Sequence, residues 1–210
     1  MAKETRNLFD PNEYQVKGGV VPMRNIDHAI LVFDIVGFSH NMVNEKMLEI
    51  VGDIHTSVME TLDPDYYWAE KDSDSNLNSL ILIPTGDGYG VALNNKLNDD
   101  EIFSITVKLY NRLKREGLKF RMGIAKGRNV LKVDLNDNLN VFGYGIVLAT
   151  RVCGVAKEGQ ILVDSRLAES LLQQRVITEL QKIEEEFEVK HNFKLNCYNY
   201  YKEKEFGIKI

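Results

Sequence analysis

The chain lacks the features that mark several large classes of protein. Its 210 residues include two cysteines, Cys153 and Cys197, which are too few for a disulfide framework and have no metal-ligand spacing. The longest apolar run, residues 29–33, is far too short to span a bilayer, and residues 1–17 contain no apolar segment typical of a secretory signal. We therefore expect a soluble, cytoplasmic protein with reduced thiols and no membrane partner.

The chain also lacks an excess of positive charge. Its formal net charge at pH 7 is −5, whereas a general nucleic-acid binder normally carries a basic excess. The four histidines follow no common metal-ligand spacing. An apolar fraction of 44% is ordinary for a globular protein. Length and composition predict one domain over residues 25–210, preceded by an irregular arm over residues 1–24 that contains Pro11 and Pro22.

Apolar patterns predict strands and helices in a mixed order. The expected strands cover residues 29–33, 80–83, 89–93, 119–124, 130–133, 161–163 and 193–201. The expected helices cover residues 47–58, 99–116, 146–155 and 165–174, with a loop at 134–140 and an acidic, solvated surface at 179–188. This order predicts an α+β fold, in which helices cover a sheet rich in antiparallel strands.

Two aspartates stand where predicted strands end. Asp34 follows the buried-strand pattern of residues 29–33, and Asp87 lies in the Gly-Asp-Gly turn of an expected hairpin. Magnesium takes one or two carboxylates plus substrate phosphates, so two converging aspartates would suit it. Each residue also has a simpler interpretation, because aspartate is a good helix cap and Asp-Gly is common in hairpin turns.

The residues after Asp34 suggest a phosphate-binding turn. Ile35, Val36, Gly37 and Phe38 lead towards a predicted helix. Backbone N–H groups at a helix N-terminus bind phosphate oxygens. We therefore expect these four residues to contact a phosphorylated substrate.

Five segments, in the same order along the chain, resemble motifs of the class III adenylyl and guanylyl cyclases. They read FDIVGFS at 33–39, TGDG at 85–88, RMGIAKG at 121–127, NVFGYGIVLATR at 140–151 and GQILV at 159–163. The resemblance covers roughly residues 28–200. It implies a ferredoxin-like cyclase homology domain that forms a dimer.

The resemblance also implies a site and a reaction. Active sites at the interface of a homodimer would bind a nucleoside triphosphate and two Mg²⁺ or Mn²⁺ ions. Asp34, Ile35 and Asp87 of one subunit would bind the metals, while Arg151 of the other matches the transition-state arginine. The ribose 3′-hydroxyl would attack the α-phosphorus and expel pyrophosphate. Lys190 resembles a lysine that contacts the terminal phosphates, although a surface lysine is an equal alternative.

Three positions depart from the family pattern. Val147 replaces the asparagine that orients the ribose, Ile83 replaces a lysine that reads adenine, and Asn140 replaces the aspartate that accepts from the adenine amino group. Valine and isoleucine side chains cannot form hydrogen bonds, whereas an asparagine amide both donates and accepts. We therefore favour a pyrimidine cyclase, similar to those of the Pycsar antiphage systems, over an adenylyl cyclase. Its cyclic CMP or cyclic UMP would be read by a separate effector protein.

Val147 also supports a different class of protein. A degenerate cyclase-like domain would bind a nucleotide or a partner without turnover. Asp34, Asp87 and Arg151 argue against it, because a pure binding module has little need for that charged set. A diguanylate cyclase is disfavoured because the chain has no Gly-Gly-Asp-Glu-Phe-type signature.

Overall fold

The computed structural model describes residues 26–38, 44–62, 81–92, 98–133, 139–174, 179–189 and 193–200. The expected N-terminal arm, residues 1–24, and Lys190 lie outside these described residues. Within the described part, no helix has the length and apolar character needed to cross a membrane.

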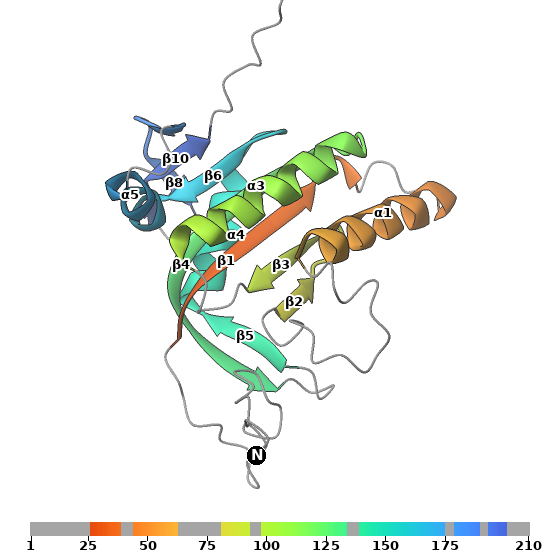
Figure 1. The fold of residues 1–210 in the computed structure, drawn as a ribbon, viewed down its shortest axis with the longest axis horizontal. Helices are drawn as coiled ribbons and strands as arrows, with labels where there is room; N and C mark the ends of the chain where they lie inside the picture. The colour runs from red at the N-terminus through yellow and green to blue at the C-terminus, as the bar shows by residue number, and fades with distance from the viewer. Residues whose placement is uncertain are drawn as a thin grey trace, which may run out of the picture.

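The described strands form one mixed sheet of eight strands and a separate pair (Figure 1). The order in the large sheet is β2 (Ile81–Pro84), β3 (Gly88–Ala92), β1 (Ile26–Ile35), β4 (Phe120–Val133), β6 (Ile161–Asp164), β10 (Cys197–Tyr200) and β7 (Leu180–Lys182). In addition, β5 (Leu139–Gly143) pairs with β4, and the separate pair is β8 (Phe187–Val189) with β9 (Phe193–Leu195). The pairings are antiparallel except that of β4 with β6, which are joined by a long crossover that includes β5 and a helix.

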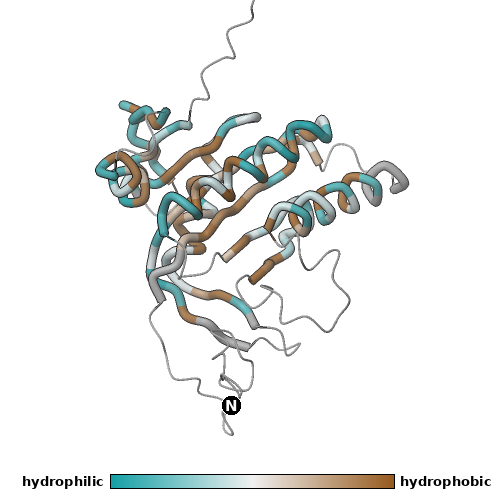
Figure 2. Tube along the Cα trace, in the orientation of Figure 1, coloured by the Kyte–Doolittle hydropathy of each residue, from teal (hydrophilic) through white to brown (hydrophobic). Residues whose placement is uncertain are grey.

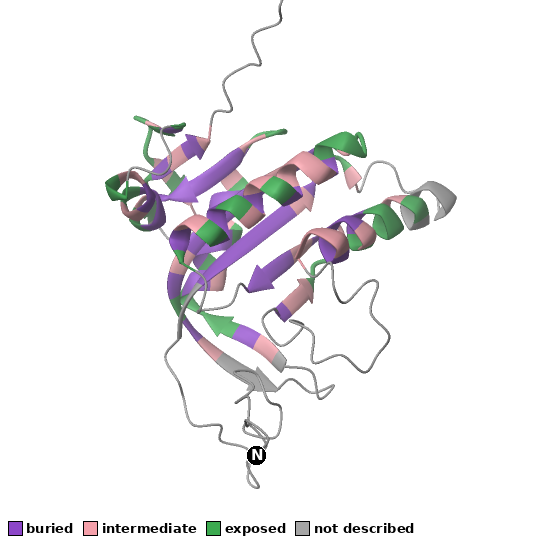
Figure 3. Cartoon of the chain, viewed as in Figure 1, coloured by how far each residue is buried: buried purple, intermediate pink, exposed green. Residues whose placement is uncertain are grey.

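Helices cover both faces of the large sheet. On one face, α1 (Asn44–Leu62), α3 (Asp99–Arg115) and α5 (Ser165–Gln173) share a core with Leu31 and Phe33 of β1. On the other face, α4 (Tyr144–Val155) shares a second core with Ile30 and Val32. Figures 2 and 3 show β1 as a hydrophobic and mostly buried strand between these layers. The predicted α+β class and the buried central strand are therefore confirmed.

Capping signals in the local sequence account for both ends of α3 and the start of α5, which lie at or within one residue of their predicted positions. Asn98 and Glu101 form a reciprocal capping box at the start of α3, and Gly117 follows its end with φ of 72°. Asp164 caps α5 by accepting from the amide of Arg166. The two cysteines are unpaired and buried, as expected for reduced thiols.

Several strand boundaries differ from the prediction. The two strands expected at 119–124 and 130–133 are one continuous strand, β4. The polar residues between them stay in the strand because Asn129 still pairs with Ile26 of β1 and Gly143 of β5. The loop expected at 134–140 gives way to β5 from Leu139. The acidic surface contains β7 and most of β8, and the expected terminal strand is split into β9 and β10.

Candidate functional site

Asp34 lies at the end of β1 on the face that α4 covers. Side chains alternate along a strand, so Asp34 shares a face with Ile30 and Val32, which pack against α4. In register, Asp34 pairs with Gly88 of β3 and with Arg121 of β4. The Gly-Asp-Gly hairpin therefore ends beside Asp34.

Backbone contacts hold the tip of this hairpin against β1. The amide of Ile35 donates to the carbonyl of Asp87 at 2.9 Å, and the amide of Thr85 donates to the carbonyl of Gly88 at 3.0 Å. Gly88 has to lack a side chain, because a Cβ there would overlap the carbonyl of Phe33. The structure thus brings Asp34 and Asp87 together, as the sequence predicted.

The Asp87 carboxylate is perturbed by burial and by its neighbour Asp34. Burial raises the pKa of Asp87, and the hydrogen bond and negative charge of Asp34 raise it further. The positive charge of Arg121 acts in the opposite direction but does not cancel these effects. The pair therefore has an excess of negative charge that a cation would relieve.

Arg121 ties Asp34 to α4. Its Nε and Nη2 atoms donate to Oδ2 of Asp34 at 3.0 and 2.6 Å, and its Nη1 donates to the carbonyl of Gly154 at 3.2 Å. Sequence reasoning placed Arg121 in a motif but assigned it no role. The signal that identifies it is its register opposite Asp34, which is readable only once β1 and β4 are known to pair.

The donor set fits a magnesium ion shared with a phosphate ligand. Within the described residues, no group of three or more His, Cys, Asp or Glu side chains could enclose a metal. Mg²⁺ keeps several waters and uses one or two carboxylates together with substrate phosphates. Asp34 and Asp87 could supply those carboxylates, and a divalent cation would counter the burial and the negative charge of Asp34 that raise the pKa of Asp87.

The expected phosphate contacts of Ile35 and Val36 need correction. The amide of Ile35 already donates to Asp87, and the amide of Val36 donates to the carbonyl of Lys119 at 2.8 Å. The side chain of Ile35 is buried in the core. These two amides continue strand-like pairing instead of starting a helix, so they are not phosphate donors. Gly37 and Phe38 form the turn that follows, and residues 39–43 lie outside the described part.

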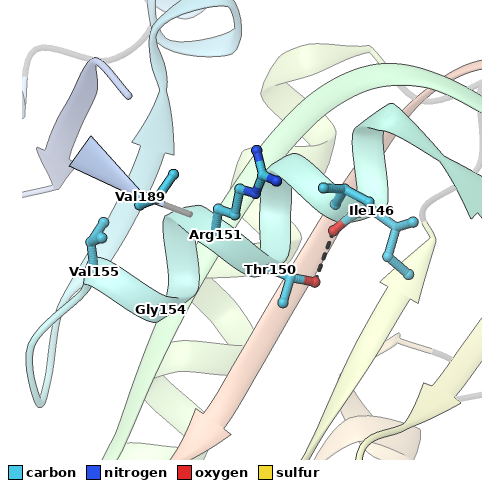
Figure 4. A pocket seen from close by; sticks show the side chains of 7 residues that line it. Ile146, Thr150, Arg151, Gly154, Val155 and Val189 are labelled. Atoms are coloured by element: carbon cyan, nitrogen blue, oxygen red, sulfur yellow. Dashed lines mark hydrogen bonds between the residues drawn. The ribbon is translucent and has the colours of Figure 1, made fainter. Parts of the chain in front are cut away.

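A pocket of about 540 Å³ lies along one face of α4 (Figure 4). Val147 and Arg151, one helical turn apart, both line it. The carbonyl of Gly154, one of the lining residues, accepts from Arg121, the residue that also binds Asp34. The described lining residues are Ile146, Val147, Thr150, Arg151, Gly154, Val155 and Val189.

The remaining expected substrate contacts lie on elements that contact α4 or one another. Ile83 of β2 is a neighbour of Ile146, since a Cβ at Gly90 would lie within 4 Å of both side chains. Asn140 is on β5, which contacts both β2 and α4. Its Oδ1 accepts from the amide of Val141 at 2.8 Å, which leaves the amide NH₂ to donate to a ligand.

No protein-family model and no curated protein sequence matches the chain. Solved structures do match it. The guanylate cyclase domain of RhGC from Catenaria anguillulae, solved with GTP, has a TM-score of 0.65 at 17% identity, covering 85% of this chain and 98% of that one. The adenylyl cyclase CyaB from P. aeruginosa has a TM-score of 0.66 at 14% identity, covering 88% and 98%. The adenylate/guanylate cyclase/hydrolase from Silicibacter pomeroyi has a TM-score of 0.58 at 17% identity, covering 86% and 99%.

These likenesses show the fold. The chain has the α+β fold of class III adenylyl and guanylyl cyclase catalytic domains, and it spans nearly the whole of each matched domain. At such low identity the likeness does not extend to chemistry, so the activity has to be argued from the residues at the site.

Proposed function

We propose that this protein is a nucleotidyl cyclase that converts a nucleoside triphosphate to a 3′,5′-cyclic nucleotide and pyrophosphate. The observation that carries the proposal is the convergence of Asp34 and Asp87 at the end of β1, within a cyclase fold. The carboxylate pair suits a metal-bound triphosphate, and Arg151, which lines the α4 pocket, would reach that triphosphate from the second subunit. The GTP complex of the RhGC domain supports the same class of substrate.

Each charged group has a proposed role. Asp34, Asp87 and the carbonyl of Ile35 would hold two Mg²⁺ or Mn²⁺ ions, which supply activation of the 3′-hydroxyl and charge stabilisation when bound. Arg121 holds Asp34 in place with two N–H donors. Arg151 would stabilise the charge that develops on the α-phosphate oxygens. Lys190 would contact the terminal phosphates.

Exposed apolar side chains support the proposed homodimer. Phe142, Tyr144 and Val147 are 47%, 52% and 46% exposed, although all three are large and hydrophobic. They follow one another closely where β5 leads into α4, beside the residues that line the pocket. Clustered apolar exposure of this kind marks an interaction surface. A second copy of the chain would cover it and complete the site, so we expect a dimer by light scattering.

The two residues expected to face the base support a pyrimidine over adenine, and among pyrimidines they favour uracil. Ile83 offers no hydrogen bond to a base. The hydrogen bond from Val141 to Oδ1 of Asn140 leaves an NH₂ donor, which suits a base carbonyl. Uracil presents such an acceptor at O4, whereas cytosine and adenine present an amino donor at the corresponding edge. Cyclic UMP read by a separate effector would fit antiphage signalling of the Pycsar type.

Product analysis tests the reaction and the base together. The protein is incubated with Mn²⁺ and each of the four nucleoside triphosphates, and the cyclic products are quantified. We expect cyclic UMP to dominate, and cyclic AMP as the main product would overturn the base assignment. Asn140→Asp should shift the ratio of CTP to UTP turnover about tenfold towards CTP, because a carboxylate accepts from the amino group.

The second candidate is a domain that binds nucleotide without turnover. Val147 favours it, because valine cannot orient a ribose. Nucleotide binding without any cyclic product, together with unchanged affinity in Asp34→Ala, would establish this alternative.

A further inference from the structure

Thr150, a residue with a hydroxyl group, lines the α4 pocket. Of the described residues that line this pocket, Arg151 is charged and the others besides Thr150 have no polar side chain. Binding pockets orient their ligands with a few polar groups set among apolar ones. An arginine suits phosphate charge, so Thr150 supplies the neutral group of the lining that suits a hydroxyl.

Thr150 lies on the same helix face as Val147, where the expected hydrogen-bonding asparagine is absent. Thr150 lies three residues after Val147 and directly before Arg151, and residues three or four apart share a helix face. Both Thr150 and Val147 are exposed. A ligand group that reaches Val147 is therefore within one helical turn of the Thr150 hydroxyl.

The hydrogen bonding of Thr150 determines what it offers to a ligand. Its Oγ1 donates to the carbonyl of Ile146 at 2.8 Å, as Figure 4 shows. Because this bond uses the hydroxyl proton, the oxygen keeps only its lone pairs for a ligand. Thr150 is therefore an acceptor, and the complementary ligand group is an O–H donor.

We propose that Thr150 orients the ribose in place of the missing asparagine, by accepting a hydrogen bond from a ribose hydroxyl. The inference rests on the proposed function, because it assumes that the pocket holds a nucleoside triphosphate. Arg151, the next residue, then faces the phosphates while Thr150 faces the sugar. The ribose contact is moved by less than one helical turn along α4.

Two substitutions at Thr150 distinguish the effect of the hydroxyl group on activity from the effect of side-chain shape. Thr150→Val removes the hydroxyl at nearly constant volume and should lower kcat/KM for cyclisation about tenfold, as for a lost hydrogen bond. Thr150→Ser keeps the hydroxyl and should retain most of the activity. Adding Val147→Asn to Thr150→Val should restore activity, because it supplies an amide on the same helix face.

Thr106 provides a matched control on α3. Its Oγ1 donates to the carbonyl of Ile102 at 3.0 Å, which is the same bond four residues back, but Thr106 is buried and not part of the pocket lining. Thr106→Val should leave kcat/KM of the folded protein unchanged. Equal losses in Thr106→Val and Thr150→Val would show that the helix bond matters and that a ribose contact does not.

Binding of deoxynucleotides identifies the hydroxyl and does not depend on turnover. Competition with 2′-deoxy and 3′-deoxy nucleoside triphosphates should show about tenfold weaker binding of one of them to the wild type. Thr150→Val should abolish that discrimination. If the wild type cyclises nucleotide but Thr150→Val keeps full activity and discrimination, this inference is wrong and the proposed function stands. If no cyclic product forms, the proposed function is wrong, and the loss or persistence of discrimination still decides the ribose contact.

Discussion

On each face of the sheet, a basic residue of strand β4 forms an ion pair with an aspartate. The two ion pairs differ in the other groups that surround the aspartate. On the α4 face Arg121 binds Asp34, and on the opposite face Lys126 binds Asp99 of α3 at 2.7 Å. Asp99 also accepts from the hydroxyl of Ser170 at 2.6 Å. Asp34 instead lies against a second carboxylate, that of Asp87, which is hydrogen-bonded to it.

The pKa shifts of the two regions have opposite signs. Burial alone would raise the pKa of Asp99, but the hydrogen bonds and charge of Lys126, with the hydroxyl of Ser170, lower it overall. The pKa of Asp87 is raised by burial and by Asp34. A complete set of partners is typical of a structural ion pair, whereas a carboxylate whose pKa is raised by burial and a like charge is a candidate for a functional site. The comparison therefore supports the proposed cation site at Asp34 and Asp87.

The largest expected effect is on catalysis. Asp87→Asn and Asp34→Asn should each lower the cyclisation rate about a thousandfold, because a metal ligand contributes several kcal/mol of transition-state stabilisation. Initial rates with Mn²⁺ and the preferred nucleotide measure the loss. Asp99→Asn, assayed on folded protein, is the matched control and should keep the wild-type rate. Near-normal activity in Asp87→Asn would remove the distinction between the two regions.

The next largest effect is on stability, and here Asp99→Asn should have a larger effect than Asp87→Asn. Asp99→Asn should lower the free energy of unfolding by about 3 kcal/mol, because it leaves the partly buried Lys126 ammonium without its counter-charge. Urea unfolding measures the change, and Asp87→Asn should show no loss. Adding Lys126→Met to Asp99→Asn should recover part of the stability, since it removes the uncompensated charge. A neutral Asp99→Asn would mean that this pair is no more structural than the other.

The sequence predicted the carboxylate pair because its signals are local. An apolar run that ends at Asp34 and a Gly-Asp-Gly turn each specify a position without any knowledge of distant residues. The resemblance then indicated that the two residues belong to one site. The ion pair of Arg121 with Asp34 was not predicted, because it depends on the register between two strands, and the two residues lie 87 positions apart in the sequence.

Errors in the prediction have the same origin. The amides of Ile35 and Val36 were expected to open a helix, but distant carbonyls at Asp87 and Lys119 keep them in strand-like pairing. Strand β5 was missed because it is only five residues long and begins within the polar stretch 134–140, so no long apolar run marks it. It forms because β4 extends far enough to pair with it.

The smallest effect is the pH dependence of stability, and it should differ in sign between the two aspartates. Both titrate near 3.8 in the unfolded chain. The folded pKa of Asp87 is raised, so its ionisation disfavours folding and stability should fall as pH rises from 3.8 through the folded pKa. The folded pKa of Asp99 is lowered, so its contribution to stability is present above pH 3.8 and is lost as pH falls through the folded pKa.

Urea unfolding between pH 3 and pH 7 measures both effects. Asp87→Asn should remove the fall in stability with rising pH, and Asp99→Asn should remove the fall in stability with falling pH. The Asp87 effect should stay within about 1 kcal/mol, because solvent screens a partly exposed carboxylate. If the Asp87 and Asp99 contributions to stability changed with pH in the same direction, Asp87 would have as favourable an electrostatic environment as Asp99. The electrostatic reason for placing a cation beside Asp34 and Asp87 would then be lost.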